Sequence, residues 1–194
     1  MLYRKQENDS LIWAVWKIDE SIDELEEMLG YRLADPNPKR KKERSAVRLL
    51  LKELLGEDAP IFYKDSGKPY LKNGFHLSIS HTRNYVSVSL SKSRSTGIDI
   101  EMISDKILRV KKKFISEKEY IDPQNEAMHL LIHWSAKEAL YKITDREIEC
   151  LKSDSILSPF SPQRSGQIMI TDTRNQEEYQ GEYLIDSDFA LVVI

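Results

Sequence analysis

Apolar and polar residues alternate over several short stretches of the chain, and this pattern predicts a fold rich in strands. Residues 11–18 are apolar almost throughout and predict a buried strand. In residues 85–90, Tyr85, Ser87 and Ser89 alternate with apolar neighbours, as in a half-buried strand. A turn is predicted at residues 81–84, a loop at residues 153–165, and further strands at residues 61–63, 75–80, 97–101, 167–171, 182–185 and 189–193.

Apolar residues that recur every three or four positions predict one long helix in each half of the chain. The first covers residues 39–55, where Gly56 can end it, and the second covers residues 126–143. Shorter helices are predicted at residues 21–30, at residues 105–113 and from residue 116, the first and last of them after a capping box. Strand-rich segments with a long helix in each half predict an α+β fold of two similar-sized halves.

Composition narrows the class of protein. The chain of 194 residues is 40% hydrophobic and 31% charged, which is typical of a folded protein. Its net charge of −3 argues against a protein that mainly holds nucleic acid. Cys150 is the single cysteine, so we expect no internal disulfide and no cysteine–histidine metal site. Without a signal-peptide pattern or an apolar run of roughly 20 residues, we expect a soluble, cytoplasmic protein that does not bind a membrane.

Two carboxylates lie close together in the predicted strand 97–101, which reads G-I-D-I-E. Because strand side chains alternate, Asp99 and Glu101 share one face. Neighbouring carboxylates repel each other unless a cation lies between them, and Mg²⁺ binds to one or two carboxylates plus substrate phosphates. Taken alone, such a pair is more typical of a solvated strand face than of a metal site.

The second long helix carries W-S-A-K-E-A-L-Y-K at residues 134–142, with Trp134, Glu138 and Lys142 four apart on one face. A Glu–Lys pair at this spacing is common on exposed helices, where it contributes about 0.3 kcal/mol. Together with the strand pair, however, it supplies three carboxylates for a metal and one ammonium group. That set suits a polyphosphate ester, because both cations neutralise charge that develops as a P–O bond breaks. P-loop and Rossmann glycine patterns are absent from the sequence.

Two other features are candidate anion sites. The first turns of helix 39–55 are densely basic, although the helix dipole favours acids there, so a bound anion and a solvated helix end are about equally supported. His81 lies at the end of a predicted strand. Without further context, a histidine there is more typical of a hydrogen-bonded turn residue.

These stretches resemble, in order, the sequence blocks of the 4′-phosphopantetheinyl transferases, specifically the longer surfactin-type class. Residues 97–101 match its G-I-D-I-E block, and residues 134–142 match W-S-x-K-E-A-x-x-K. Supporting blocks are a G-K-P turn at residues 67–69, an F-N-x-S-H-like block at residues 75–81 and an F-x-x-x-E-x block at residues 114–119.

The resemblance implies an enzyme that moves the phosphopantetheine arm of coenzyme A onto a serine of an acyl or peptidyl carrier protein and releases 3′,5′-ADP. It implies that Asp99, Glu101 and Glu138 hold Mg²⁺, with Mn²⁺ as an alternative. Lys142 would contact the phosphates and stabilise or protonate the leaving group. Glu138 or Glu119 would be the base for the carrier serine, acting through water. A catalytically silent coenzyme A-binding or regulatory module and a metal-dependent phosphohydrolase are the alternatives.

The resemblance also implies where coenzyme A binds. Arg40 or Arg44 would meet the 3′-phosphate of its ADP moiety. The remaining coenzyme A-binding residues implied are Lys68, Pro69, Ser80 and His81. Lys111, Lys112 and Lys113 form a basic run that could meet an acidic carrier-protein helix or be a solvated helix end.

The fold implied consists of two pseudo-symmetric halves, residues 1–100 and residues 101–194. Each would be a small antiparallel sheet packed with a long helix, with the active site in the cleft between them. A chain with both halves is expected to act as a monomer. Residues 143–148 contain no glycine where the family usually has one, which bears on carrier-protein docking more than on the core chemistry.

Overall fold

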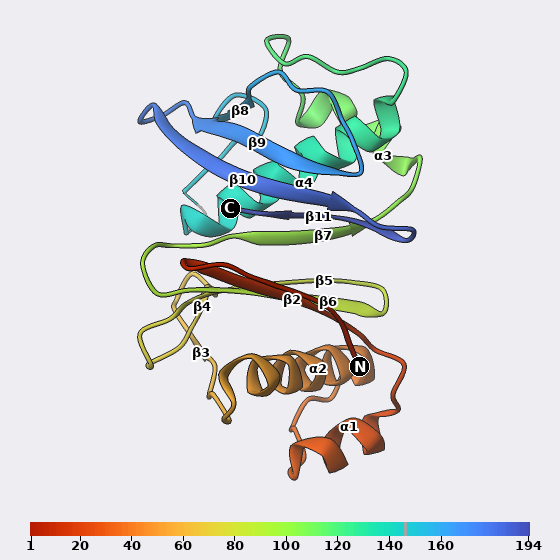
Figure 1. Ribbon diagram of the computed structural model, residues 1–194, viewed down its shortest axis with the longest axis vertical. Coiled ribbons are helices and arrows are strands. Elements are labelled where there is room, and N and C mark those ends of the chain that lie inside the picture. Colours follow the sequence, from red (N-terminus) through yellow and green to blue (C-terminus); the bar gives the residue numbers. More distant parts are fainter. Residues whose placement is uncertain (146) are drawn as a thin grey trace. The chain divides into compact units, whose positions relative to one another are not determined.

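Each half of the chain forms its own antiparallel sheet with one long helix. The computed structural model describes residues 1–145 and 147–194, which divide into two compact units, Met1–Ser95 and Thr96–Ile194. Each unit contains one main antiparallel sheet and one helix of 18 residues (Figure 1). The predicted α+β fold is therefore confirmed. Arg146, part of the glycine-free stretch after the second long helix, lies outside the described residues.

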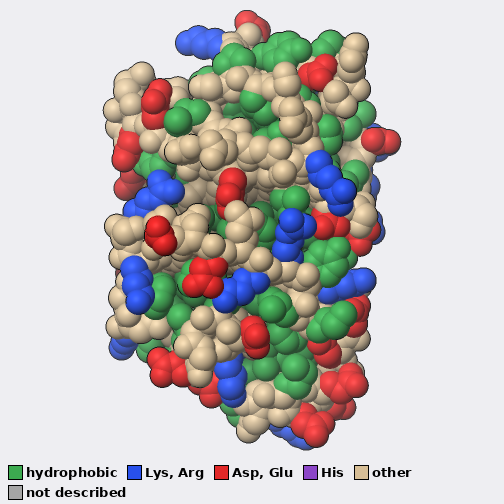
Figure 2. Space-filling view, viewed as in Figure 1, with side chains coloured by type: hydrophobic (Ala, Val, Ile, Leu, Met, Phe, Trp, Pro, Cys, Tyr) green, Lys and Arg blue, Asp and Glu red, His purple; other side chains and the backbone are tan. Residues whose placement is uncertain are grey.

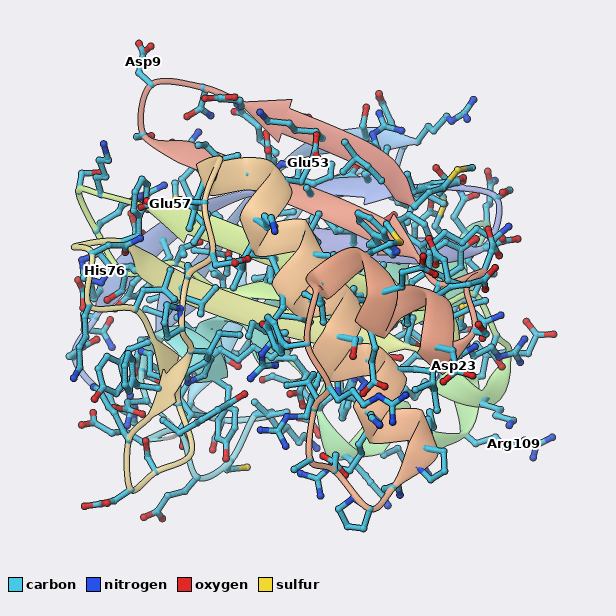
Figure 3. The ribbon with its side chains drawn as sticks, turned by 90° about the horizontal axis from the view of Figure 1, so that it is seen from below. Asp9, Asp23, Glu53, Glu57, His76 and Arg109 are labelled. Atoms are coloured by element: carbon cyan, nitrogen blue, oxygen red, sulfur yellow. The ribbon has the colours of Figure 1, made fainter. Side chains whose placement is uncertain are left out.

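The first unit has a four-stranded sheet in the order β1-β2-β6-β5 and a separate two-stranded ribbon of β3 and β4. The helix α2 packs against β2 and β6, and α1 packs against α2, as Figure 3 also shows. Its elements are β1 (Leu2–Glu7), β2 (Leu11–Lys17), α1 (Ile22–Leu29), α2 (Pro38–Leu55), β3 (Phe62–Tyr63), β4 (Pro69–Tyr70), β5 (His76–Thr82) and β6 (Tyr85–Ser91).

The second unit has a five-stranded sheet in the order β7-β11-β10-β9-β8, and α4 packs on it. The apolar side of α4, including Ile132 and Leu140, meets Ile168, Ile170 and Val192 in a common core. Its elements are β7 (Ile98–Met102), α3 (Lys106–Val110), the 3₁₀ turn η1 (Lys111–Lys113), α4 (Glu126–Ile143), β8 (Ser155–Leu157), β9 (Ser165–Asp172), β10 (Glu177–Ile185) and β11 (Phe189–Val193).

The local signals in the sequence explain the two helices of the first unit. Ser21 Oγ accepts from the backbone N–H of Glu24, and the Glu24 carboxylate accepts from the backbone N–H of Ser21, so the predicted capping box is confirmed. The long helix α2 begins after Asn37, whose side chain accepts a hydrogen bond from the helix start. It ends at Gly56, which has a positive φ of 75°.

Two predicted helices of the second unit differ in the structure. The helix expected over residues 105–113 is shorter and continues as the 3₁₀ turn η1. No helix begins at Ser116, and residues 115–120 are irregular with a short turn at residues 117–118. The backbone N–H of Ser116 still donates to the Glu119 carboxylate at 2.8 Å, so half of the capping box forms without a helix. The Glu119 side chain is fixed in buried contacts, and Pro123 soon interrupts the chain.

Several strands also differ from the pattern-based prediction. β1 is exposed along its whole length, so it shows no apolar alternation, and β8 lies inside the predicted loop 153–165. β6 is buried on both faces, including Ser87 and Ser89, rather than half-buried. Because β5 extends to Thr82, only two residues connect it to β6, and the first of these, Arg83, takes the positive φ that tight hairpins require.

Positive and negative side chains are mixed on the face that Figure 2 shows. Lys and Arg side chains lie among Asp and Glu side chains there, in both units. None of the helices formed by residues 1–145 and 147–194 combines the length and apolar character that crossing a membrane requires.

Gly97 fixes how closely α4 can approach the start of β7. A Cβ atom at this position would lie 2.0 Å from the carbonyl oxygen of Ala139 in α4. The Gly97 backbone also exchanges two hydrogen bonds with Ile194, of 3.0 and 2.9 Å. Packing therefore explains the glycine of the G-I-D-I-E block. The backbone of α4 leaves no room for a side chain there, and the C-terminal residue Ile194 is bonded to the Gly97 backbone.

We expect Gly97→Ala to lower the free energy of unfolding by about 3 kcal/mol or more, because the clash is with backbone that cannot move aside like a side chain. Chemical denaturation monitored by circular dichroism would measure this. Ser95→Ala, at an exposed position two residues earlier, is the matched control and should change stability by less than about 0.5 kcal/mol. Equal stability of the two variants would contradict the packing argument.

Candidate active site

The G-I-D-I-E strand motif and the W-S-A-K-E-A-L-Y-K helix motif meet where α4 packs beside β7. The Lys142 ammonium group of α4 donates to Asp99 Oδ1 at 2.9 Å and to the Ile98 carbonyl at 2.7 Å. About two helical turns earlier on α4, Trp134 Nε1 donates to Glu101 Oε1 at 3.1 Å. Glu138 lies between these two helix residues on the same face. The strand carboxylates and the helix motif thus form one cluster.

The electrostatics of this cluster are dominated by negative charge. Burial raises the pKa of Glu101, and the charge of Asp99 raises it further, against weaker opposing effects of Trp134 and Lys142. Burial likewise raises the pKa of Glu138, with the charge of Asp99 again the next cause. These carboxylates are therefore close enough to oppose each other's ionisation. Additional positive charge at the cluster would stabilise their ionised forms.

The donor set fits a hard divalent cation that arrives with a phosphate ligand. Within residues 1–145 and 147–194, no group of three or more His, Cys, Asp or Glu side chains is arranged to hold a metal ion by itself. Asp99, Glu101 and Glu138 nonetheless supply carboxylate oxygens that repel each other in a partly buried setting. Mg²⁺ commonly takes only one or two carboxylates and completes its shell with water and substrate phosphates. The residues match that mode of binding.

Glu119 lies in a second, fully buried polar cluster. Its Oε2 atom accepts from Lys137 Nζ at 2.8 Å and from the backbone N–H of Ser116. Its Oε1 atom accepts from the backbone N–H of Leu157 at 3.0 Å and lies 3.1 Å from His133 Nδ1. Burial alone would raise the pKa of Glu119, but the bond with His133 and the charge of Lys137 outweigh it and lower the pKa. These contacts favour a structural role for Glu119.

Lys137 is the cation at the centre of this buried cluster. Besides Glu119, its ammonium group donates to the backbone carbonyls of Phe114, Leu151 and Ser155, at 2.7 to 3.0 Å. Burial lowers the pKa of Lys137, while the charge of Glu119 opposes that effect. The pair therefore ties α4 to the turn before it and to β8. Removing one partner alone would leave a buried charge uncompensated.

Two buried histidines complete this cluster, and the pattern analysis did not single them out. His129 Nδ1 accepts from the backbone N–H of Asp122 at 3.0 Å, and its ring lies 4.8 Å from that of His133. The Phe160 ring stacks on His133 and meets His129 edge-on. Their spacing in the sequence could have indicated this cluster, because residues 129, 133 and 137 are four apart and therefore share one face of the helix.

In the first unit, several of the residues expected to bind coenzyme A lie on α2 and β5. Arg44 donates to Asp35 Oδ2 at 2.9 Å, and this bond is the main reason why the pKa of Asp35 lies below its usual range. His81, at the end of β5, lies 3.5 Å from the Glu43 carboxylate of α2, and Ser80 before it is buried. The structure thus joins His81 to the basic start of α2.

The other residues expected to bind coenzyme A lie in different surroundings. Arg40 is exposed in the first turn of α2. The backbone N–H of Lys68 bonds to Ser66 Oγ at 3.3 Å in the turn that leads into β4. Pro69 begins β4, which packs beside β5, so the G-K-P turn and the strand carrying His81 are neighbours.

Comparison with known proteins identifies relatives of the chain. A family model described as the 4′-phosphopantetheinyl transferase superfamily matches residues 95–193. The 4′-phosphopantetheinyl transferase gsp of Aneurinibacillus migulanus is 30% identical over 116 residues, which cover 51% of this chain and 48% of that protein. The 4′-phosphopantetheinyl transferase psf-1 of Bacillus pumilus is 34% identical over 90 residues, 43% of this chain and 38% of that protein. The matches thus span about half, or less, of the relatives' length, and the resemblance found from the motifs is confirmed.

We expect the free energy of unfolding to fall as the pH is lowered from about 6.5 to 4, partly because of His129. Burial lowers the pKa of His129 from 6.5 to about 4, so in this range the unfolded chain binds a proton that the folded chain does not. One such proton contributes at most about 1.4 kcal/mol per pH unit. Denaturation series at several pH values should give a shallower slope for His129→Asn.

His76→Asn is the matched control for this titration. His76 is exposed at the start of β5 and is labelled in Figure 3. Its replacement should leave the pH dependence of the wild-type protein unchanged. Equal slopes for His129→Asn and the wild type would show that the buried ring does not contribute to the loss of stability in acid.

Proposed function

The chain belongs to the 4′-phosphopantetheinyl transferase superfamily, and we propose that it transfers the 4′-phosphopantetheine group of coenzyme A to a serine of an apo acyl or peptidyl carrier protein. The products would be the holo carrier protein and 3′,5′-ADP. The observation that carries this proposal is the hydrogen bond between Lys142 and Asp99, which joins the strand motif to the helix motif. A site for a polyphosphate ester needs both the carboxylates and the ammonium group.

The reaction proposed is a displacement at phosphorus. The carrier serine Oγ forms a bond to the phosphorus of the phosphopantetheine arm, and the P–O bond to 3′,5′-ADP breaks. Asp99, Glu101 and Glu138 would hold Mg²⁺, or Mn²⁺ in its place, which supplies positive charge to the pyrophosphate when bound. Lys142 adds an ammonium group that can stabilise the leaving phosphate or give it a proton. Its flexible stem allows the ammonium to reach a phosphate from its bond with Asp99.

Glu138 is the base we propose for the serine proton, through an intervening water molecule. Its place supports the proposal, because it lies between Trp134 and Lys142 on the face of α4 that bonds to Glu101 and Asp99 of β7. Glu119 is the less suitable candidate. Its carboxylate is fully buried and bonded to Lys137, so we assign it the role of holding α4 in place.

We assign coenzyme A binding to the first half, residues 1–100, and the helix motif and final strands to the second, residues 101–194. Arg40 or Arg44 would bind the 3′-phosphate, since both lie at the basic start of α2. The remaining phosphate ligands proposed are Lys68, Ser80 and His81, and Pro69 is proposed to contact coenzyme A as part of the G-K-P turn. We also propose that the enzyme is a monomer and that it acts in the cytoplasm, together with its carrier protein.

The proposed transfer is tested by the intact mass of an apo carrier protein incubated with this protein, coenzyme A and Mg²⁺. We expect a mass gain of one phosphopantetheine group on the carrier, and no gain when EDTA is present, because the reaction needs the metal. Fatty-acid and peptide-synthesis carriers should both be offered. Coenzyme A binding without any gain on either carrier would contradict the transfer and would indicate a binding module instead.

We expect Glu138→Gln to lower the rate of transfer by about 100-fold or more, since it removes both a proposed metal ligand and the proposed base. The measurement is the initial rate of holo carrier formation at saturating coenzyme A. Glu178→Gln, at an exposed position on β10, is the matched control and should leave the rate unchanged. A Glu138→Gln variant with the wild-type rate would remove Glu138 from the proposed site.

A further inference from the structure

Glu43, on the side of α2 that faces β5, is a buried carboxylate which the sequence motifs do not include. Its side chain is only 8% exposed, although burying an ionised carboxylate is costly unless a partner compensates for it. Its Oε1 atom accepts no hydrogen bond from any part of the chain that the structure describes. A buried oxygen of this kind calls for an explanation by function or by a nearby cation.

Among the described residues, two basic side chains face this oxygen, and they differ in how firmly they are held. Lys39 Nζ lies 3.7 Å away, one helical turn earlier, but the lysine side chain is 72% exposed. His81 Nδ1 lies 3.5 Å away and comes from β5, a strand fixed by its pairing with β6. The lysine therefore retains its hydration and its freedom, whereas the imidazole is presented to Glu43 by a rigid element.

The two ring nitrogens of His81 face different surroundings. With Nδ1 facing Glu43, the other nitrogen, Nε2, points away from that carboxylate. The His81 side chain is 54% exposed, so this end of the ring is open to a ligand. In the imidazolium form both nitrogens are donors, and one can donate to Glu43 while the other donates to a phosphate oxygen. Negative charge on both sides then stabilises that form of the ring.

We propose that Glu43 is a positioning residue for His81. Its buried carboxylate holds the Nδ1–H side of the imidazole so that the Nε2–H donates to a phosphate group of coenzyme A. The inference rests on the proposed function, in which His81 binds coenzyme A. It extends the site to a residue outside the matched sequence blocks, just before Arg44 on the same helix.

The test is a double-mutant cycle on coenzyme A affinity, measured by isothermal titration calorimetry with the full chain. Glu43→Gln keeps the size of the side chain and removes its charge. We expect it to weaken coenzyme A binding by about 5- to 10-fold, the scale of the net contribution of one hydrogen bond. In the His81→Ala background, Glu43→Gln should have no further effect, because a positioning residue acts only through the residue that it holds.

The matched control is Glu53→Gln, which removes a carboxylate from an exposed position of the same helix (Figure 3). It should leave coenzyme A affinity unchanged. Wild-type affinity in Glu43→Gln, or an equal loss with and without His81, would overturn the proposal. Thermal unfolding of each variant identifies any loss that comes from misfolding.

A spectroscopic measurement keeps the proposal testable if Glu43→Gln does not fold. The ¹⁵N chemical shifts of the His81 ring in the wild-type complex with coenzyme A report which nitrogens carry a proton. We expect both to be protonated, and an unprotonated Nδ1 would overturn the positioning role. Failure of the wild-type protein to bind coenzyme A would overturn the proposed function together with this inference. Normal wild-type binding with an unaffected Glu43→Gln variant would overturn the inference alone.

Discussion

The close approach of α4 to β7 is the constraint on which the second unit depends. Gly97 permits it by having no side chain where the carbonyl oxygen of Ala139 lies. Because the two backbones approach at this point, Lys142 of the helix can reach both Asp99 and the Ile98 carbonyl of the strand. A bulkier residue at position 97 would move the helix outward and separate these groups. The glycine of the strand motif thus serves the chemistry through packing.

The second unit treats its buried carboxylates in two opposite ways. Glu119 is fully compensated by Lys137, His133 and two backbone N–H groups, so its pKa is lowered and its charge is stable. Glu101 and Glu138 remain under-compensated beside Asp99, and burial together with that charge raises their pKa values. The first arrangement stabilises the fold, whereas the second leaves electrostatic repulsion that a bound cation would reduce. Perturbed groups of the second kind are typical of functional sites.

Sequence patterns predicted what depends on local periodicity and failed where long-range contacts decide. Both long helices and the capping box at Ser21 could be predicted, because each has a signal within a few residues. The pairing of the two main motifs has no local signal and was expected from their chemistry and from the family resemblance. The polar edge strand β1 has no such signal, since it is exposed throughout and takes its place in the sheet by pairing with β2. The helix expected at Ser116 failed because Glu119 bonds to α4 rather than capping a helix. Glu43 escaped notice because its role depends on β5.

The same arrangement occurs in both units: a carboxylate contacts a basic side chain that is a candidate phosphate ligand. Asp35 holds Arg44, Glu43 faces His81, and Asp99 holds Lys142. Under the proposed function, this arrangement would let a chain of net charge −3 bind a polyanionic substrate. Its affinity would come from a few basic side chains that are already held in place. The entropic cost of ordering these side chains would arise when the chain folds, so it would not weaken binding. A protein that relied on a broad basic surface would bind nucleic acid as well, whereas fixed single cations select a ligand whose phosphates match their positions.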